Sequence, residues 1–332
     1  MKLAVVGAGG MGHAWTRTVQ AQKGAAVTAI VDPLVASGNT APWVDELEDV
    51  VMASSLADLN EAEVDAVIVT AFSPAHAQVI KESLELGLHV IVEKPFTTSL
   101  EDAEALVELA AKRNKYLMVS QNYRFFPGTQ EVCRLVASGE YGPVRSVIGR
   151  FWCDWPGKPY QHEMVHPMAL EMAIHHLDMV RAMFGAEATA GRVREWNPAW
   201  SPYRMGAALE ALFEMTGDDT SFPFAYSGSL VGKAPRTPWG GLWRFEFEKA
   251  SLIADEIEGT YGLFEASESG YELLSPFAGE TMMIGASLQH FMECVEQGKE
   301  PWSSGRDNIG TMKMALCYTE GTNSTTSSGK GS

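Results

Sequence analysis

A lysine at the end of an apolar segment is the first candidate for chemistry in this chain. Residues 88–93 read Leu-His-Val-Ile-Val-Glu, a run typical of a buried strand, and Lys94 and Pro95 follow it directly. Open α/β sheets bind ligands beyond the carboxyl ends of their strands, so Lys94 would present a fixed cation to a bound molecule. The alternative is a solvated lysine at a strand end.

The first residues carry a glycine pattern typical of dinucleotide binding. Residues 3–6 form an apolar strand, and Gly7, Gly9 and Gly12 follow in the spacing Gly-x-Gly-x-x-Gly before a helical pattern. The first glycine permits a tight turn, the second lets the backbone approach a pyrophosphate, and the third lets the helix pack on the strand. The helix N-terminus then faces the anion.

Asp32 ends the next apolar segment, about 20 residues after the glycines. At that place a carboxylate accepts hydrogen bonds from the hydroxyls of the adenosine ribose. Pro33 and Leu34 supply no cation for a 2′-phosphate, so we expect NAD as the cofactor, with NADP less favoured. The alternative is an aspartate that only forms a turn before Pro33.

A third group of polar residues lies within an expected helix at 170–184. Glu171, His175 and Asp178 are spaced i, i+4 and i+7 and would share one face. An imidazole with a pKa near ~6.5 is suited to removing a hydroxyl proton near neutral pH, oriented by a carboxylate. The alternative is an amphipathic helix with a solvated polar side.

Other histidines and tryptophans invite further interpretations. His162, Glu163 and His166 resemble a metal-ligand cluster, but Pro167 argues against one helix carrying these residues into the later motif, so we expect no metal site. Trp155 and its neighbouring tryptophans are either core or interface residues or part of a carbohydrate site.

The elements that must position these residues divide the chain in two. Residues 1–121 alternate strands and helices, which predicts a doubly wound parallel sheet. Residues 122–318 predict a second α/β domain with a mostly antiparallel sheet, and 319–332 a disordered tail rich in Gly, Ser and Thr. The expected strands are 3–6, 27–31, 50–53, 66–70, 88–93, 116–120, 144–152, 189–195, 222–230, 243–248, 251–257 and 262–266. One helix is expected directly after Gly12. The other expected helices are 56–59, 74–86, 100–113, 170–184, 288–297 and 308–318.

Composition excludes several classes of function. The chain has 332 residues and a formal charge of -17, and it lacks the basic stripe that nucleic-acid binding needs. It also shows neither an apolar run of transmembrane length nor a secretory signal, so we expect a cytoplasmic protein without a membrane partner. The four cysteines are widely spaced and are expected to be reduced.

Together these motifs resemble the Gfo/Idh/MocA oxidoreductase family over most of the chain, from residue 1 to about 185. The segments that carry the resemblance are 7–12, 71–76, 93–95, 122–125, 142–144 and 171–178. The resemblance implies a Rossmann domain joined to an α/β domain whose large open sheet often forms the face of a homodimer or homotetramer. It also implies NAD(P)-dependent oxidation or reduction of CH–OH groups in sugars, polyols or cyclitols.

The resemblance also implies roles for individual residues. Lys94 matches the family's active-site lysine and His175 its catalytic histidine, while Glu171 stands where most members have aspartate. The residues expected to bind the dinucleotide are Gly7, Ala8, Gly9, Gly10, Met11, Asp32, Ala71, Ser73, His76, Glu93, Lys94 and Asn122. The residues expected to contact the substrate are Arg124, Trp155, His166 and His176.

Three classes of function remain open at this level. The first is hydride transfer between NAD and a secondary alcohol, with His175 as the base and Lys94 stabilising the alkoxide. The second is redox-neutral cleavage of a glycoside, or elimination, through transient oxidation of the sugar by a retained NAD. The third is a cofactor-bound regulator that performs no chemistry.

Overall fold

The computed structural model describes residues 1–59, 64–218, 220–279 and 282–316. The chain forms two compact units, and each is described by itself. The first comprises Met1–Asn122 and Met282–Ile309, and the second comprises Tyr123–Thr281 and Gly310–Ser332. The tail predicted at 319–332 lies outside the described residues.

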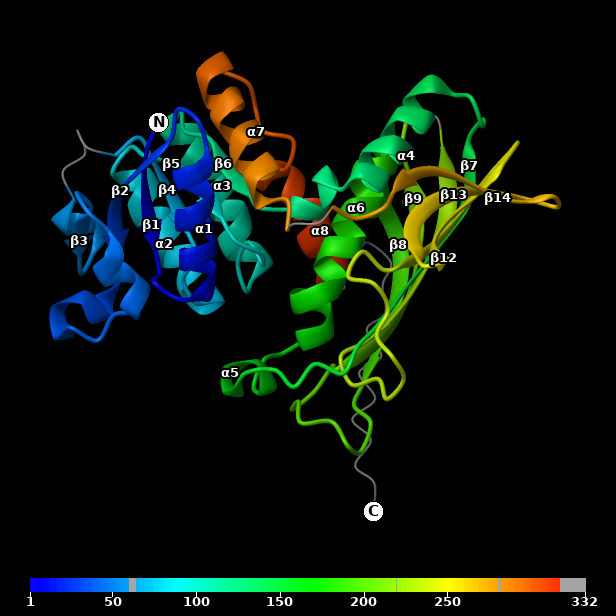
Figure 1. Cartoon of the computed structure of the whole chain (residues 1–332), viewed down its shortest axis with the longest axis horizontal. Coiled ribbons are helices and arrows are strands. Elements are labelled where there is room, and N and C mark those ends of the chain that lie inside the picture. Colours follow the sequence, from blue (N-terminus) through cyan, green and yellow to red (C-terminus); the bar gives the residue numbers. More distant parts are fainter. Residues whose placement is uncertain (60–63, 219, 280–281, 317–332) are drawn as a thin grey trace. The chain divides into compact units, whose positions relative to one another are not determined.

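The first unit is built on a parallel sheet of six strands in the order β3-β2-β1-β4-β5-β6 (Figure 1). The central strands β1, β4 and β5 are buried on both faces over almost their whole length, which explains their continuous apolar runs. The strands are β1 (Lys2–Val6), β2 (Ala26–Val31), β3 (Val51–Ala53), β4 (Ala66–Val69), β5 (His89–Val92) and β6 (Leu117–Val119). The helices are α1 (Gly10–Ala21), α2 (His76–Glu85), α3 (Leu100–Arg113) and α7 (Ile284–Gln297). The predicted doubly wound sheet is confirmed.

The strand order reverses between β1 and β4, which are hydrogen-bonded neighbours. In open α/β sheets this switch point leaves a crevice beyond the carboxyl ends of the two strands, because the following helices turn to opposite faces. The glycine loop follows β1, and the segment beginning at Ala71 follows β4. The first unit therefore brings two of the predicted cofactor-binding segments to its switch point.

Helix α7 belongs to the first unit, although the predicted second domain, 122–318, included it. Its buried residues Leu288 and Phe291 share one core cluster with Leu3, Trp15 and Val19 of β1 and α1. Figure 1 shows α7 beside α1. The periodicity of α7 shows that one face is apolar, but it does not say which sheet that face covers.

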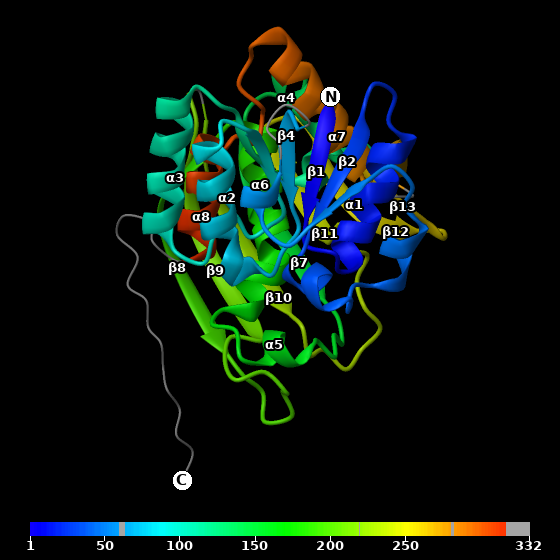
Figure 2. The same cartoon turned by 90° about the vertical axis from the view of Figure 1, so that its left-hand side faces the viewer.

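The second unit is built on a sheet of eight strands in the order β14-β13-β12-β11-β7-β10-β9-β8. All pairings are antiparallel except that of β7 with β10, so the predicted large and mostly antiparallel sheet is confirmed. Figure 2 shows β8, β9 and β10 side by side. The strands are β7 (Val144–Trp152), β8 (Glu187–Trp196), β9 (Ala208–Thr216), β10 (Ser221–Ser229), β11 (Leu242–Phe247), β12 (Ser251–Ile257), β13 (Thr260–Ser267) and β14 (Gly270–Pro276).

Two long helices of this unit, α4 (Pro127–Ser138) and α6 (Ile174–Phe184), pack against each other. Phe184 of α6 meets Phe222 and Phe245 of the sheet, so one sheet face is covered. The short α5 (Pro159–His162) precedes a π-helical turn at Ala169–Ala173 that leads into α6. Helix α8 (Gly305–Ala315) contributes residues to both units. The sequence analysis predicted neither α4 nor β9 and β14.

Candidate active site

The glycine loop leaves room for a ligand only at its middle. Gly7 has φ +103°, and a Cβ there would lie 2.8 Å from the Ala71 nitrogen. A Cβ on Gly12 would lie 2.0 Å from the Gly7 carbonyl oxygen, so neither position accepts a side chain. At Gly9, the N-cap of α1, a Cβ would meet no atom within 4 Å, and no side chain caps the helix. The first amide groups of α1 therefore suit an anion that approaches over Gly9.

Asp32, the predicted ribose ligand, is hydrogen-bonded to the glycine loop. Its Oδ2 accepts the Ala8 N–H at 2.8 Å and its Oδ1 accepts the Leu34 N–H at 2.9 Å. A carboxylate has about four acceptor sites, so these two bonds leave capacity for the hydroxyls of a ribose. The two bonds fix the carboxylate beyond the carboxyl end of β2.

Thr70 and Trp15 also hold this region together, and the sequence analysis did not single them out. The Thr70 hydroxyl lies 2.9 Å from the Gly7 carbonyl oxygen, which joins the end of β4 to the glycine loop. The Trp15 indole N–H donates to Glu93 Oε1 at 2.7 Å. The Glu93 carboxylate, predicted as a cofactor contact, is thus bonded to α1.

His76 joins two loops, and its ring nitrogens are directed at the protein. Its Nδ1 lies 2.8 Å from the Pro95 carbonyl oxygen and its Nε2 lies 2.9 Å from that of Ala71. The side chain is 1 % exposed, and burial lowers its pKa. Its predicted contact with the cofactor stays a prediction, and the contacts that the structure shows for its ring are with the protein backbone. His76 positions the loops after β4 and β5, because a buried imidazole can bridge segments that are distant in sequence.

Lys94 is half-buried directly after β5, and its peptide bond to Pro95 is cis. Ser73 begins a short 3₁₀ turn after β4. Asn122 follows β6, is buried, and donates its side-chain N–H to the Met282 carbonyl oxygen. The predicted dinucleotide residues thus all follow the carboxyl ends of strands of one parallel sheet.

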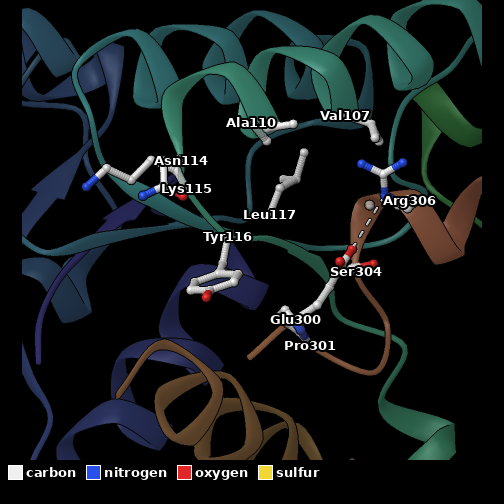
Figure 3. A pocket seen from close by; sticks show the side chains of 12 residues that line it. Val107, Ala110, Asn114, Lys115, Tyr116, Leu117, Glu300, Pro301, Ser304 and Arg306 are labelled. Atoms are coloured by element: carbon white, nitrogen blue, oxygen red, sulfur yellow. Dashed lines mark ion pairs between the residues drawn. The ribbon is translucent and has the colours of Figure 1, made fainter. Parts of the chain in front are cut away.

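A separate hollow of the first unit lies away from these residues (Figure 3). It is lined by the last turns of α3, by residues 114–117 and by residues 300–306. Within the last of these segments Arg306 Nε lies 3.9 Å from Glu300 Oε1. Residues 114–117 lead into β6, so this hollow lies at the amino end of that strand. Ligands of open α/β sheets bind at the opposite end, so it is not the dinucleotide site.

In the second unit, three loops emerge at one end of the sheet. The strand register aligns Trp152 with Ser229, Ser229 with Ala208, and Ala208 with Trp196. The loops that follow β7, β8 and β10 therefore all leave the sheet at this end. They comprise residues 153–158, 197–207 and 230–241, and we call them the end loops.

The turn that precedes α6 is bonded to this same end. The Met168 N–H donates to the Gly206 carbonyl oxygen at 3.0 Å. His166, at φ 60°, forms an ion pair with Glu195 near the end of β8. Hydrogen bonding to Glu195 raises the pKa of His166, which keeps its ring protonated to higher pH. The start of the helix that carries His175 therefore lies at the end loops.

His175 stacks on Tyr123, with ring centroids 4.4 Å apart and planes within 13°. The histidine is 7 % exposed, and burial raises the pKa of Tyr123, so the phenol remains neutral. Glu171 is half-buried within the π-helical turn. Burial raises the pKa of Tyr160, and the charge of Glu171 adds to that rise. The π-helical turn alters the regular spacing on which the predicted shared face of Glu171 and His175 was based.

His176 and Arg124, both predicted to contact substrate, are core residues instead. His176 is fully buried, with Nδ1 2.7 Å from the Tyr226 hydroxyl and Nε2 3.0 Å from the Trp239 carbonyl oxygen. Burial lowers its pKa to about 4. A neutral ring that donates from Nε2 and accepts from Tyr226 satisfies both bonds.

Arg124 is 1 % exposed and donates two hydrogen bonds of 2.7 Å to Asp178. Asp178 is buried as well, so the alternative interpretation of this helix as one with a solvated polar side does not hold for Asp178. A buried guanidinium requires a carboxylate partner, and this pairing turns both side chains inward.

Trp155 remains at the surface of the end loops. It is 39 % exposed, and its ring meets Trp239 edge-on with centroids 5.7 Å apart. Its backbone N–H donates to the Leu230 carbonyl oxygen at 2.7 Å, so two of the end loops are joined there.

Comparison with known proteins identifies the first unit's sheet. Residues 1–121 match the family model described as the oxidoreductase family with an NAD-binding Rossmann fold, GFO_IDH_MocA. The match to this family is thus shown for the Rossmann part of the chain. The predicted resemblance to this family and the class of NAD-binding oxidoreductase are confirmed.

Relatives match beyond the Rossmann sheet. The scyllo-inositol 2-dehydrogenase (NAD(+)) of Bacillus subtilis is 26% identical over 96% of this chain and 93% of its own length. The inositol 2-dehydrogenase of Corynebacterium glutamicum is 28% identical over 58% of this chain and 57% of its own length. A crystal structure of an oxidoreductase from Agrobacterium radiobacter in complex with NAD+, L-tartaric acid and magnesium superposes with a TM-score of 0.83. That structure is 21% identical and covers 95% of this chain and 94% of its own.

Among residues 1–59, 64–218, 220–279 and 282–316, no helix is both long and apolar enough to cross a membrane. The same part of the chain contains no group of three or more His, Cys, Asp or Glu side chains able to hold a metal ion.

Proposed function

We propose that this protein transfers a hydride from a secondary alcohol of a polyol, cyclitol or sugar to NAD. The observation that carries the proposal is that the open glycine loop, Asp32 and Lys94 all follow the carboxyl ends of strands of one parallel sheet, the edge at which such sheets bind ligands. The match to the family and the inositol dehydrogenases among the relatives support this substrate class.

The residues of the first unit suit a dinucleotide, and Asp32 favours NAD over NADP. Its carboxylate is fixed by Ala8 and Leu34, and Pro33 and Leu34 offer no cation to a 2′-phosphate. When bound, the nicotinamide ring supplies the hydride acceptor. The amide groups at the start of α1 would bind the pyrophosphate over Gly9.

In the proposed reaction His175 removes the hydroxyl proton, and its stacking on Tyr123 restrains the plane of the ring. Lys94 donates a hydrogen bond to the same oxygen and offsets its developing negative charge, a role commonly worth ~3 kcal/mol of the barrier. Glu171 would orient the imidazole. Trp155 and His166 would contact the substrate.

We also propose that the exposed face of the second sheet joins copies of this chain. Burial alternates along β7 and β9, so that one face packs on the helices and the other carries exposed apolar side chains such as Ile148 and Leu212. The exposed face is hollowed across β7, β8, β9 and β10. A homodimer or homotetramer through this sheet would cover it.

The test is a panel of polyols, inositols, sugars, sugar phosphates, sugar acids and glycosides, each assayed with NAD and with NADP. We expect NADH to accumulate in step with an oxidised product and NADP to support slower turnover. Product formation without NADH would instead support the redox-neutral class. Absence of turnover with every compound, despite NAD binding, would contradict the proposal and favour a regulator.

A further inference from the structure

The end loops carry more cations than carboxylates although the chain as a whole is acidic, and this local charge bears on the substrate. Residues 153–158, 197–207 and 230–241 contain four cationic side chains and one carboxylate, whereas the whole chain has a formal charge of -17. The cations are Lys158, Arg204, Lys233 and Arg236. A local excess of positive charge attracts anionic ligands.

The single carboxylate of these loops is already paired. The Asp154 carboxylate lies 3.9 Å from the Lys233 ammonium group. The backbone of Asp154 also forms an isolated β-bridge with Val231. Within the part of the chain that the structure describes, no ion pair of Arg236 is found. The guanidinium of Arg236 is exposed and so remains available to a ligand.

Aromatic stacking holds Arg236 close to the helix of the proposed base. Its Cζ lies 5.2 Å from the ring centroid of Trp239. The Trp239 carbonyl oxygen accepts from His176 Nε2 at 3.0 Å, and His176 adjoins His175 in α6. A planar guanidinium stacked on a ring keeps its donor edge free for a carboxylate or phosphate.

The base of this loop is fixed as well. The Thr237 N–H donates to the Trp152 carbonyl oxygen at 2.9 Å, and the Trp152 N–H donates to the Thr237 hydroxyl at 3.1 Å. Trp155 packs edge-on against Trp239. Arg236 therefore projects from a segment anchored to both β7 and α6, and the two indoles beside it offer apolar surface to the C–H groups of a sugar ring.

We propose that the substrate is an acidic sugar or cyclitol derivative whose carboxylate or phosphate binds Arg236, while its ring lies against Trp155 and Trp239. This inference rests on the proposed function, because it assigns the substrate class of the same site. Arg236 acts as a specificity determinant, and the charge it binds lies away from the carbon that is oxidised.

Three groups of compounds test the inference in steady-state assays with NAD. The neutral group is myo-inositol, glucose and galactose, the carboxylate group is glucuronate and galacturonate, and the phosphate group is glucose 6-phosphate and myo-inositol 1-phosphate. We expect at least one anionic compound to exceed every neutral one in kcat/KM by roughly tenfold or more, as for a charge-assisted hydrogen bond. The carboxylate and phosphate arms separate the two sources of charge. A neutral compound as the best substrate would overturn the inference and leave the dehydrogenase proposal intact.

Variants of Arg236 identify the recognition group. Arg236→Met should raise KM for the preferred anionic substrate roughly tenfold with little change in kcat, and Arg236→Lys should restore part of the affinity. Arg145→Met removes an exposed cation at the other end of β7, where Arg145 pairs with Glu248, and should leave KM unchanged. Equal loss for neutral and anionic compounds in Arg236→Met would refute the role in charge recognition.

Calorimetry keeps the inference testable if no compound is oxidised. Glucuronate and glucose 6-phosphate are titrated into the protein with NAD present, and one of them should bind the wild-type chain but not Arg236→Met. Binding without turnover would then contradict only the proposed reaction. Absence of binding by every anionic compound would contradict the inference itself.

Discussion

Arg124 and Asp178 form a fully buried ion pair with two hydrogen bonds of 2.7 Å, and the Thr311 hydroxyl donates a third bond of 2.7 Å to the same carboxylate. The pair joins the segment before α4 to α6 and α8. Arg124 thereby supports the helix that carries His175, in place of the substrate contact that its position in sequence indicated.

Removal of one partner of this pair should destabilise the protein strongly. Arg124→Met removes the cation that is hydrogen-bonded to the buried Asp178 carboxylate and leaves only Arg181, 3.9 Å away, beside it. We expect a loss of about 3–5 kcal/mol in the free energy of unfolding. The measurement is chemical denaturation followed by circular dichroism. The double variant Arg124→Met with Asp178→Leu should lose less than Arg124→Met alone, since no buried charge remains from the pair. Arg145→Met, in an exposed ion pair with Glu248, should change stability by less than about 1 kcal/mol.

Lys94→Ala and His175→Ala should each lower kcat by about a hundredfold or more, because one removes charge stabilisation and the other the proposed base. NAD affinity, measured by quenching of protein fluorescence, should persist in both variants. Lys81→Ala, which removes an exposed lysine of α2, serves as the control. Near-normal turnover in either Lys94→Ala or His175→Ala would contradict the role assigned to that residue.

Gly9→Ala and Gly12→Ala should separate cofactor binding from folding. A Cβ at Gly9 meets no protein atom within 4 Å, so the variant should fold but bind NAD roughly tenfold more weakly, because the methyl group occupies the path of the pyrophosphate. A Cβ at Gly12 lies 2.0 Å from the Gly7 oxygen and should cost about 1–3 kcal/mol of stability. Thermal denaturation and NAD titration of both variants check the prediction. Equal thermal midpoints for the two would show that the loop relaxes around Gly12.

Stability should fall in mild acid through His176. Burial lowers its pKa to about 4, against 6.5 in the unfolded chain, so between these pH values the unfolded state binds a proton that the folded state does not. The free energy of unfolding should therefore decrease as pH falls from 6.5 to 4, with His176 accounting for about 3 kcal/mol of that decrease. Denaturation of the wild type and of His176→Gln at several pH values tests this. An equally steep pH dependence in the variant would assign the effect to other groups, such as His76.

Local sequence patterns were sufficient to predict the dinucleotide half of the site. Strand and helix periodicities in residues 1–121 are strong, and consecutive parallel strands must place their carboxyl ends at one edge of the sheet. The glycine loop, Asp32 and Lys94 therefore share that edge by connectivity alone. By contrast, β9 contains several helix-forming residues, Ala, Leu, Glu and Met, and becomes a strand through pairing with β8 and β10.

The amino-acid sequence by itself determined which residues carry reactive groups and which strand ends present them. Only the tertiary structure decided that His176 and Arg124 are buried among core residues, that α7 covers the first sheet, and that the end loops meet. The physical reason is that burial, ion pairing and strand register depend on partners far away in the chain. No local spacing specifies those partners, whereas the end of a buried strand is marked by its own residues.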